Sequence, residues 1–193
     1  MTLFRTIGLG ETMAPILGQG VILRVPLASD YDSWAALRHQ SRAFLTPWEP
    51  TWPADDLTKI AFRRRIRRYG QEMREDTAYS FFIFADATLV GGLTLSNVRR
   101  GVAMTCALGY WMGAPYAGKG LMSASLRALL PHVFGKMGLH RIEAATMPHN
   151  RASMTLLEKV GFQREGYARK YLCIAGAWQD HLLFARLAED ACG

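Results

Sequence analysis

Residues 116–135 read Tyr-Ala-Gly-Lys-Gly-Leu-Met-Ser-Ala-Ser-Leu-Arg-Ala-Leu-Leu-Pro-His-Val-Phe-Gly, which places a glycine-flanked lysine between a strand-like run and an amphipathic helix. Because Gly118 and Gly120 carry no side chain, the chain can turn tightly there and a ligand can approach the backbone. The free N–H groups at the start of the following helix, and the positive end of its dipole, attract negative charge. We therefore interpret this segment as a candidate pyrophosphate cradle, although a Gly-x-Gly before a helix is often only a turn.

A second helix start follows at residues 149–162, His-Asn-Arg-Ala-Ser-Met-Thr-Leu-Leu-Glu-Lys-Val-Gly-Phe. Asn150 is a favourable N-cap residue, and Gly161 is typical of a helix end. The apolar residues between them fall on one side of a short helix. The chain thus contains two helix N-termini whose first amides need acceptors.

Further motifs accompany these two segments: Phe44-Leu45, Pro47-Trp48-Glu49-Pro50, Ser96-Asn97-Val98, Arg100-Gly101, Leu108-Gly109-Tyr110, Glu165-Gly166-Tyr167-Ala168, Tyr171-Leu172, Gly176, Trp178 and Asp180-His181. Together they resemble the GCN5-related N-acetyltransferase family, whose acyl-CoA site uses a glycine loop after the fourth strand and an Asn-led helix after the fifth. Within that family the chain is similar to the RimJ-type ribosomal-protein-alanine N-acetyltransferases over roughly residues 20 to 187.

The resemblance implies an α/β (α+β) fold, in which a mixed, mostly antiparallel central sheet is splayed between its fourth and fifth strands and carries helices on both faces. The apolar patterns predict strands at residues 20–27, 79–85, 89–97, 104–112, 140–147, 167–175 and 177–187. They predict helices at residues 29–45, 55–74, 121–130 and 150–160. We expect Pro131 to kink or end the third of these helices.

Length and composition indicate one folded domain, because the chain has 193 residues, half of them hydrophobic and 20% charged. We expect this domain to span residues 19–193 after a loose leader of residues 1–18, which lacks the apolar core of a secretion signal. No apolar stretch approaches the roughly 20 residues that a membrane helix needs. The cysteines, Cys106, Cys173 and Cys192, have no metal-like spacing and fit free thiols of a cytoplasmic protein, the first two in the core.

For acetyl-CoA the resemblance implies contacts with the main chain. The loop residues expected to present N–H groups to the pyrophosphate are Gly118, Lys119, Gly120, Leu121, Met122 and Ser123. The strand residues expected to pair with the pantetheine amides, much as an added strand does, are Leu108, Gly109, Tyr110, Trp111 and Met112. The Tyr110 and Trp111 side chains fit the core and rim of a sheet equally well. Ala117 and Met122 depart from the family pattern Gln/Arg-x-x-Gly-x-Gly/Ala, so a side-chain contribution at Ala117 is lost.

Two residues of the second helix start are further candidates. Asn150 could bond the pantetheine arm or merely cap its helix, and the resemblance favours both roles together. Many relatives protonate the departing thiolate with a tyrosine four residues before the Gly-Phe pair, where this chain has Leu157. By analogy with the RimJ and RimL types, Ser153 is therefore the candidate acid, and a capping-box serine is the alternative.

The general base is harder to find, because residues 104–112 contain no carboxylate where many relatives keep a glutamate. Glu49, between Trp48 and Pro50, is the best remaining acid near the expected acceptor groove, and partly apolar surroundings could raise its pKa toward the range that suits a base. It could instead bind the ammonium before reaction or shape its loop. An α-amine titrates near ~7.7, so a neutral fraction exists at neutral pH without strong assistance.

No metal is expected. His149 and His181 have no partner at a ligand-like spacing, and no HExxH or CxxC motif accompanies them, so we expect structural roles for both. Asp180-His181 belongs to the RimJ-like pattern and could also face the acceptor.

The formal net charge of +7 favours acidic partners, and its densest source is the cluster Arg63, Arg64, Arg65, Arg67 and Arg68. This cluster could be the solvated face of a surface helix, or could contact ribosomal RNA or cofactor phosphates. The resemblance implies direct transfer, in a ternary complex, from acetyl-CoA to the α-amine of an N-terminal alanine on a ribosomal protein. Two alternatives stay open: acetylation of a small-molecule amine, and a non-catalytic module that binds RNA or the ribosome.

Overall fold

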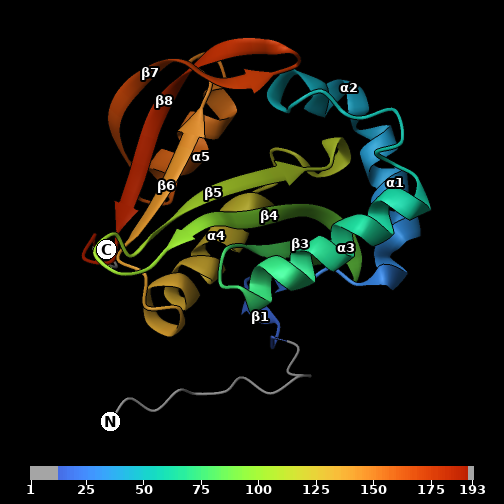
Figure 1. The fold of residues 1–193 in the computed structure, drawn as a ribbon, viewed down its shortest axis with the longest axis horizontal. Helices are drawn as coiled ribbons and strands as arrows, with labels where there is room; N and C mark the ends of the chain where they lie inside the picture. The colour runs from blue at the N-terminus through green and yellow to red at the C-terminus, as the bar shows by residue number, and fades with distance from the viewer. Residues whose placement is uncertain (1–12, 191–193) are drawn as a thin grey trace.

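The computed structural model describes residues 13–190, and Cys192 lies outside this range. A single mixed sheet runs through it in the order β1-β2-β3-β4-β5-β6-β8-β7 (Figure 1). Its strands are β1 Ile16–Gly18, β2 Val21–Arg24, β3 Tyr79–Ala85, β4 Thr88–Arg99, β5 Thr105–Met112, β6 Arg141–Thr146, β7 Gln163–Ile174 and β8 Ala177–Leu187. Neighbouring strands are antiparallel except β5 and β6, which are parallel. The predicted mixed, mostly antiparallel sheet is confirmed.

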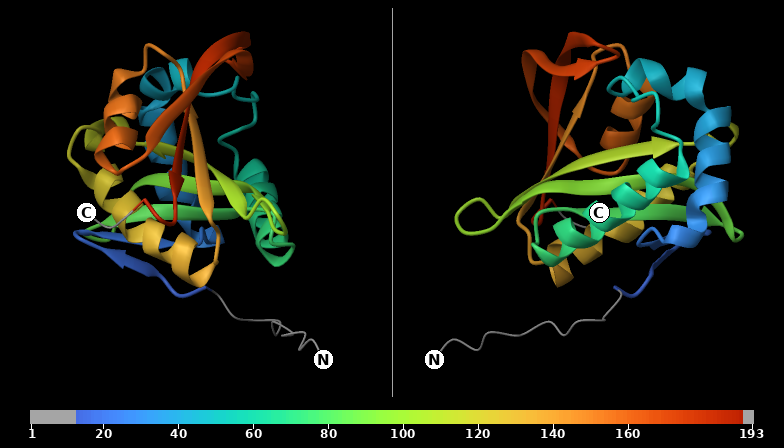
Figure 2. Two further views of the ribbon diagram at one scale, coloured as in Figure 1. Left: turned by 90° about the vertical axis from the view of Figure 1, so that its left-hand side faces the viewer. Right: turned by 45° about the vertical axis from the view of Figure 1, so that its right-hand side comes forward.

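Helices cover both faces of this sheet, also as predicted (Figure 2). They are α1 Tyr31–Gln40, α2 Arg42–Leu45, α3 Lys59–Arg74, α4 Leu121–Pro131 and α5 Arg151–Lys159. Helices α1 and α3 contact β4 and β3, whereas α4 contacts β1, β2 and α5 on the other face. None of the helices in the described part of the chain is long and apolar enough to cross a membrane.

Two buried clusters follow from the alternation of side chains along the strands. On β3, Phe81 packs into the larger cluster with α4, and its neighbour Phe82 points the other way. Phe82 joins Trp34 of α1 and Phe62 of α3, which is fully buried. The sheet is therefore buried on both faces, and each helix layer is fixed to it by apolar contacts.

The sheet opens between β5 and β6, which are the fourth and fifth of the strands predicted from sequence. Thr105–Leu108 of β5 pair with Arg141–Ala144 of β6, but residues 109–112 of β5 have no partner on β6 within the described range. The loops that follow the two strands lead into α4 and α5. The N-termini of α4 and α5 therefore lie at the same edge of the sheet, where β5 and β6 separate, as expected for a sheet splayed between these strands.

Several predicted boundaries were wrong. The predicted leader includes β1, whose residues pair with β2, while residues 1–12 lie outside the described range. The first helix breaks at Ser41, whose buried hydroxyl accepts a hydrogen bond from the Ala114 amide at 2.9 Å. The basic helix begins at Lys59 rather than at residue 55, because Thr58 Oγ1 caps it by accepting from the Ala61 amide at 3.2 Å.

Two further predictions concern Pro131 and the cysteines. Helix α4 ends at Pro131, close to the predicted end, and a π-helical turn over His132–Lys136 follows it. Cys106 is buried as predicted, and burial raises the pKa of its thiol to about 12. The prediction was wrong for Cys173, which is exposed because it lies on β7, a strand whose side chains are exposed or half-buried up to Ile174.

Candidate active site

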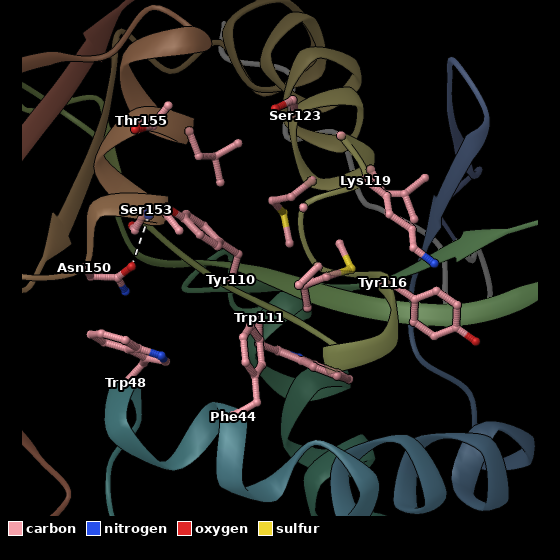
Figure 3. A pocket seen from close by; sticks show the side chains of 18 of the residues that line it. Phe44, Trp48, Tyr110, Trp111, Tyr116, Lys119, Ser123, Asn150, Ser153 and Thr155 are labelled. Atoms are coloured by element: carbon pink, nitrogen blue, oxygen red, sulfur yellow. Dashed lines mark hydrogen bonds between the residues drawn. The ribbon is translucent and has the colours of Figure 1, made fainter.

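A pocket of about 430 Å³ lies where β5 and β6 separate (Figure 3). It joins the glycine loop and the start of α5 to the segment that follows α1. Its lining residues are Phe44, Leu45, Trp48, Glu49, Tyr110, Trp111, Met112, Tyr116, Ala117, Gly118, Lys119, Gly120, Leu121, Met122, Ser123, Asn150, Ala152, Ser153, Thr155, Leu156 and Lys159. The structure thus brings the predicted loop, Asn150, Ser153 and Glu49 to one pocket.

The glycine loop forms an open turn at the N-terminus of α4. Gly118 and Gly120 have φ of +73° and +79°, values that favour glycine, and nothing lies within 4 Å of a Cβ built at either position. The first amide of this region with a carbonyl acceptor in the described structure is Ala124, which donates to Gly120 at 3.0 Å. The amides of residues 118–123 are therefore available to a ligand, and their geometry fits an anion cradle.

Strand β5 contributes only part of the predicted stretch to the pocket. Tyr110, Trp111 and Met112 line it, whereas Leu108 and Gly109 do not. Leu108 is the last residue of β5 paired with β6, and its side chain is buried in the core. The backbone beyond it is left without a β6 partner, which is the arrangement that pairing with an extended ligand requires.

Ser153 makes a contact that the sequence did not predict. Its Oγ lies 2.7 Å from the hydroxyl of Tyr110, and its amide donates to Asn150 Oδ1 at 3.1 Å (Figure 3). Asn150 therefore caps α5, as one of its predicted roles required. Leu157, at the position of the relatives' tyrosine, is fully buried in the core. The hydroxyl pair of Ser153 and Tyr110 occupies the pocket instead.

Burial reinforces the neutral state of the Tyr110 hydroxyl. It raises the pKa of Tyr110 to about 12, so the phenol stays neutral at ordinary pH. A neutral phenol can donate its proton to the Ser153 oxygen, which leaves the serine proton free to point into the pocket. The sequence predicted a backbone role for Tyr110 and a place for its side chain in the core or rim of the sheet, but not the contact with Ser153. The alternation of Leu108, Tyr110 and Met112 along one strand could have shown that their side chains share a face.

The surroundings of Glu49 are not the partly apolar ones that were expected. Arg38 Nη1 and Nη2 donate to Glu49 Oε1 and Oε2, both at 2.7 Å, and Trp52 Nε1 donates to Oε2 at 2.7 Å. The Glu49 carbonyl also accepts from the Ala175 amide, in the β7–β8 turn, at 2.9 Å. The carboxylate is thus a fixed member of an ion pair, which corrects the expected setting of a free base. Arg38 was missed by the sequence analysis.

Neither histidine lines the pocket. His181 is 3% exposed, and its Nδ1 lies 3.0 Å from the Gln179 carbonyl. His149 packs against Trp48 with ring centroids 5.3 Å apart, and it lines a second hollow with Asp180 and Trp178. Within residues 13–190 no group of three or more His, Cys, Asp or Glu side chains could hold a metal ion.

Comparisons with known proteins agree with this geometry. The family described as Acetyltransferase (GNAT) domain matches residues 21–163. The [Ribosomal protein uS5]-alanine N-acetyltransferase of Escherichia coli (strain K12) is 36% identical over 172 residues, which cover 87% of this chain and 89% of that protein.

Two solved structures resemble this one closely. Mycobacterium smegmatis RimJ in complex with CoA-disulfide has a TM-score of 0.87 at 34% identity, covering 93% of this chain and 88% of that one. The ribosomal-protein-S5-alanine acetyltransferase of Vibrio fischeri has a TM-score of 0.85 at 28% identity, covering 94% and 100%. Family match, sequence identity and fold agree with the site geometry, and the chain belongs to the GCN5-related N-acetyltransferase (GNAT) family as an acetyltransferase of the RimJ type.

Proposed function

We propose that this protein transfers the acetyl group of acetyl-CoA to the α-amine of a protein N-terminus, and that the acceptor is the N-terminal alanine of a ribosomal protein. The observation that carries the proposal is one continuous pocket, lined by the glycine loop, Ser153 and Glu49. The activities for which the similar proteins of Escherichia coli and Vibrio fischeri are named support this acceptor class. Free thiols and a ribosomal acceptor fit a reaction in the cytoplasm.

Different residues along the pocket have different proposed roles in binding acetyl-CoA and in proton transfer. The amides of residues 118–123 bind the pyrophosphate of acetyl-CoA. The backbone of residues 109–112, which pairs with β4 but not with β6, orients the pantetheine. Asn150 holds Ser153 at the N-terminus of α5 through the 3.1 Å hydrogen bond. Ser153 is thereby fixed where it can donate a proton to the sulfur as the thioester breaks.

The proton and electron balance of the transfer is simple. A neutral amine attacks the thioester carbonyl, a C–N bond forms and the C–S bond breaks. The nitrogen loses its surplus proton to solvent, the sulfur receives the proton of Ser153, and Ser153 regains one from the hydrogen-bonded Tyr110 and solvent. No covalent acetyl-enzyme is needed, so transfer proceeds directly in a ternary complex.

Thiol release with different acceptors tests the proposal. A peptide that begins with the N-terminal alanine sequence of ribosomal protein uS5 is expected to release CoA thiol and to gain the mass of one acetyl group. Aminoglycosides and polyamines are expected to give release at the buffer rate. Turnover with a small amine but not with the peptide would contradict the proposed acceptor, and no turnover with any amine would favour a non-catalytic module.

The basic helix α3 is the proposed contact with ribosomal RNA. Arg64, Arg65 and Arg68 pair with Asp55, Asp56 and Glu72 respectively. Arg63 and Arg67 are exposed, are four residues apart on one side of α3, and form no ion pair within the described residues. These two guanidinium groups are therefore the ones free to meet phosphates.

The same assay tests this contact when ribosomal subunits replace the peptide. The double variant Arg63→Gln/Arg67→Gln is expected to raise KM for the subunit and to lower the salt slope of RNA binding by about 2, roughly one for each lost phosphate contact. Its KM for the free peptide should not change. Arg64→Gln, which removes an already paired charge, is the matched control. Equal effects of the two variants would contradict the assignment.

A further inference from the structure

A buried guanidinium holds the Glu49 carboxylate at the wall of the pocket. Arg38 of α1 is 6% exposed and makes two parallel hydrogen bonds to Glu49. Its guanidinium lies 4.0 Å from the ring centroid of Trp52 and 5.0 Å from that of Trp111. The two aromatic faces and the bidentate pair fix the orientation of the Arg38 guanidinium. The fixed guanidinium in turn fixes the orientation of the Glu49 carboxylate.

Stability alone does not account for this arrangement. A buried ion pair contributes little net stability, because desolvation offsets the attraction of the charges. The Nε atom of Arg38 is also buried without a hydrogen-bond partner in the described structure, which carries a cost of its own. The pair therefore needs another explanation, and its place beside the pocket supplies one.

The hydrogen bonds leave one position of the carboxylate unused. A carboxylate offers about four lone-pair sites. Glu49 Oε2 accepts from both Arg38 and Trp52, whereas Oε1 accepts only from Arg38 among the described residues. The Glu49 side chain is 19% exposed and lines the pocket. Oε1 thus has room for one more donor, on a side chain that borders the pocket.

We propose that Glu49 Oε1 is the docking point for the α-ammonium of the acceptor, and that Arg38 is the positioning residue that aims it. This inference rests on the proposed function, since it names how the acceptor is held in that pocket. The preferred ligand is a primary ammonium, which combines positive charge with N–H donors. Glu49 then selects and places the amine, and the ammonium loses its proton to solvent before attack.

Binding of two matched peptides to the CoA-saturated protein tests the inference. One peptide begins with alanine, and the other carries lactic acid at that position, so that a hydroxyl replaces the ammonium. At about pH 6.5 the α-amine is mostly protonated. Wild type is expected to bind the alanyl peptide about tenfold more tightly than the lactyl peptide, as a charged hydrogen bond implies. The preference should shrink as the pH rises through the titration of the amine.

Substitutions assign this preference to its residues. Glu49→Gln and Arg38→Lys should each remove the preference while the dissociation constant for CoA stays within about twofold of wild type. Arg24→Lys is the matched control, because Arg24 forms a similar bidentate pair with Asp30, at 2.8 and 2.6 Å, and lies 4.2 Å over Phe84 outside the pocket. It should keep the preference.

The outcomes separate this inference from the proposed function. It is overturned if wild type shows no preference, if Arg38→Lys retains it, or if Arg38→Lys weakens CoA binding to the same extent. If Glu49 were a base, Glu49→Gln would keep the binding preference and lose turnover. A wild-type protein that prefers the alanyl peptide but transfers no acetyl group would contradict the proposed function and leave the docking site standing.

Discussion

Gly120→Glu is expected to weaken the binding of CoA at least about 100-fold, the largest effect among these variants. The substitution puts a carboxylate beside the amides of residues 118–123, where the pyrophosphate of the proposed cosubstrate binds. It also forces a side chain onto a backbone with φ of +79°. Titration calorimetry with CoA measures the loss directly.

Gly101→Glu separates electrostatics from backbone strain. Gly101 has φ of +70° and open space around a Cβ, as Gly120 does, but it lies in the turn between β4 and β5 and does not line the pocket. The control therefore adds the same charge with similar strain and should leave CoA affinity unchanged. A similar loss of CoA affinity in both variants, or no loss in Gly120→Glu, would contradict the binding of pyrophosphate by the amides of residues 118–123.

Ser153→Ala is expected to lower kcat about 100-fold with little change in the KM for acetyl-CoA, since the loss of a general acid typically costs at least this much. Tyr110→Phe keeps the ring and removes only the hydroxyl that orients Ser153, so about a tenfold loss is expected. Because burial raises the pKa of Tyr110 to about 12, the phenol does not ionise below pH 10. Tyr110→Phe should therefore lower kcat by the same factor at every pH below 10, and the apparent pKa values of the kcat profile in that range should not change.

Steady-state kinetics from pH 6 to 10 check these values. Ser80→Ala is the matched control, because Ser80 is also a buried hydroxyl, 3.2 Å from Thr94 Oγ1, and lies outside the pocket. It should keep wild-type kcat. Unaltered turnover in Ser153→Ala would rule out the serine as the acid, and a loss confined to KM would assign it to binding.

The parts of the site that the sequence predicted are those whose chemistry is local. Gly118 and Gly120 adopt positive φ within a short turn, and Asn150 caps a helix three residues before the amide that it accepts from. Strand positions followed from apolar alternation over short windows. The splay between β5 and β6 came from the family resemblance, and no residue pattern alone indicated it.

The parts that the sequence did not predict join residues far apart in the chain. Tyr110 and Ser153 are 43 residues apart, and Arg38 and Glu49 are 11 apart on segments separated by the break at Ser41. Side-chain pairing across elements depends on their packing, which periodicity does not encode. The same limit explains β1, whose three residues are too few to show a pattern. The setting of Glu49 was mispredicted because its partner, Arg38, lies on helix α1 before the break at Ser41.

A crystal structure with bound CoA and an alanyl peptide would test the central claim most directly. We expect pyrophosphate oxygens within hydrogen-bond distance of amides in residues 118–123, and the CoA sulfur next to Ser153 Oγ. CoA bound at another place, or a sulfur remote from the Ser153–Tyr110 pair, would contradict the account.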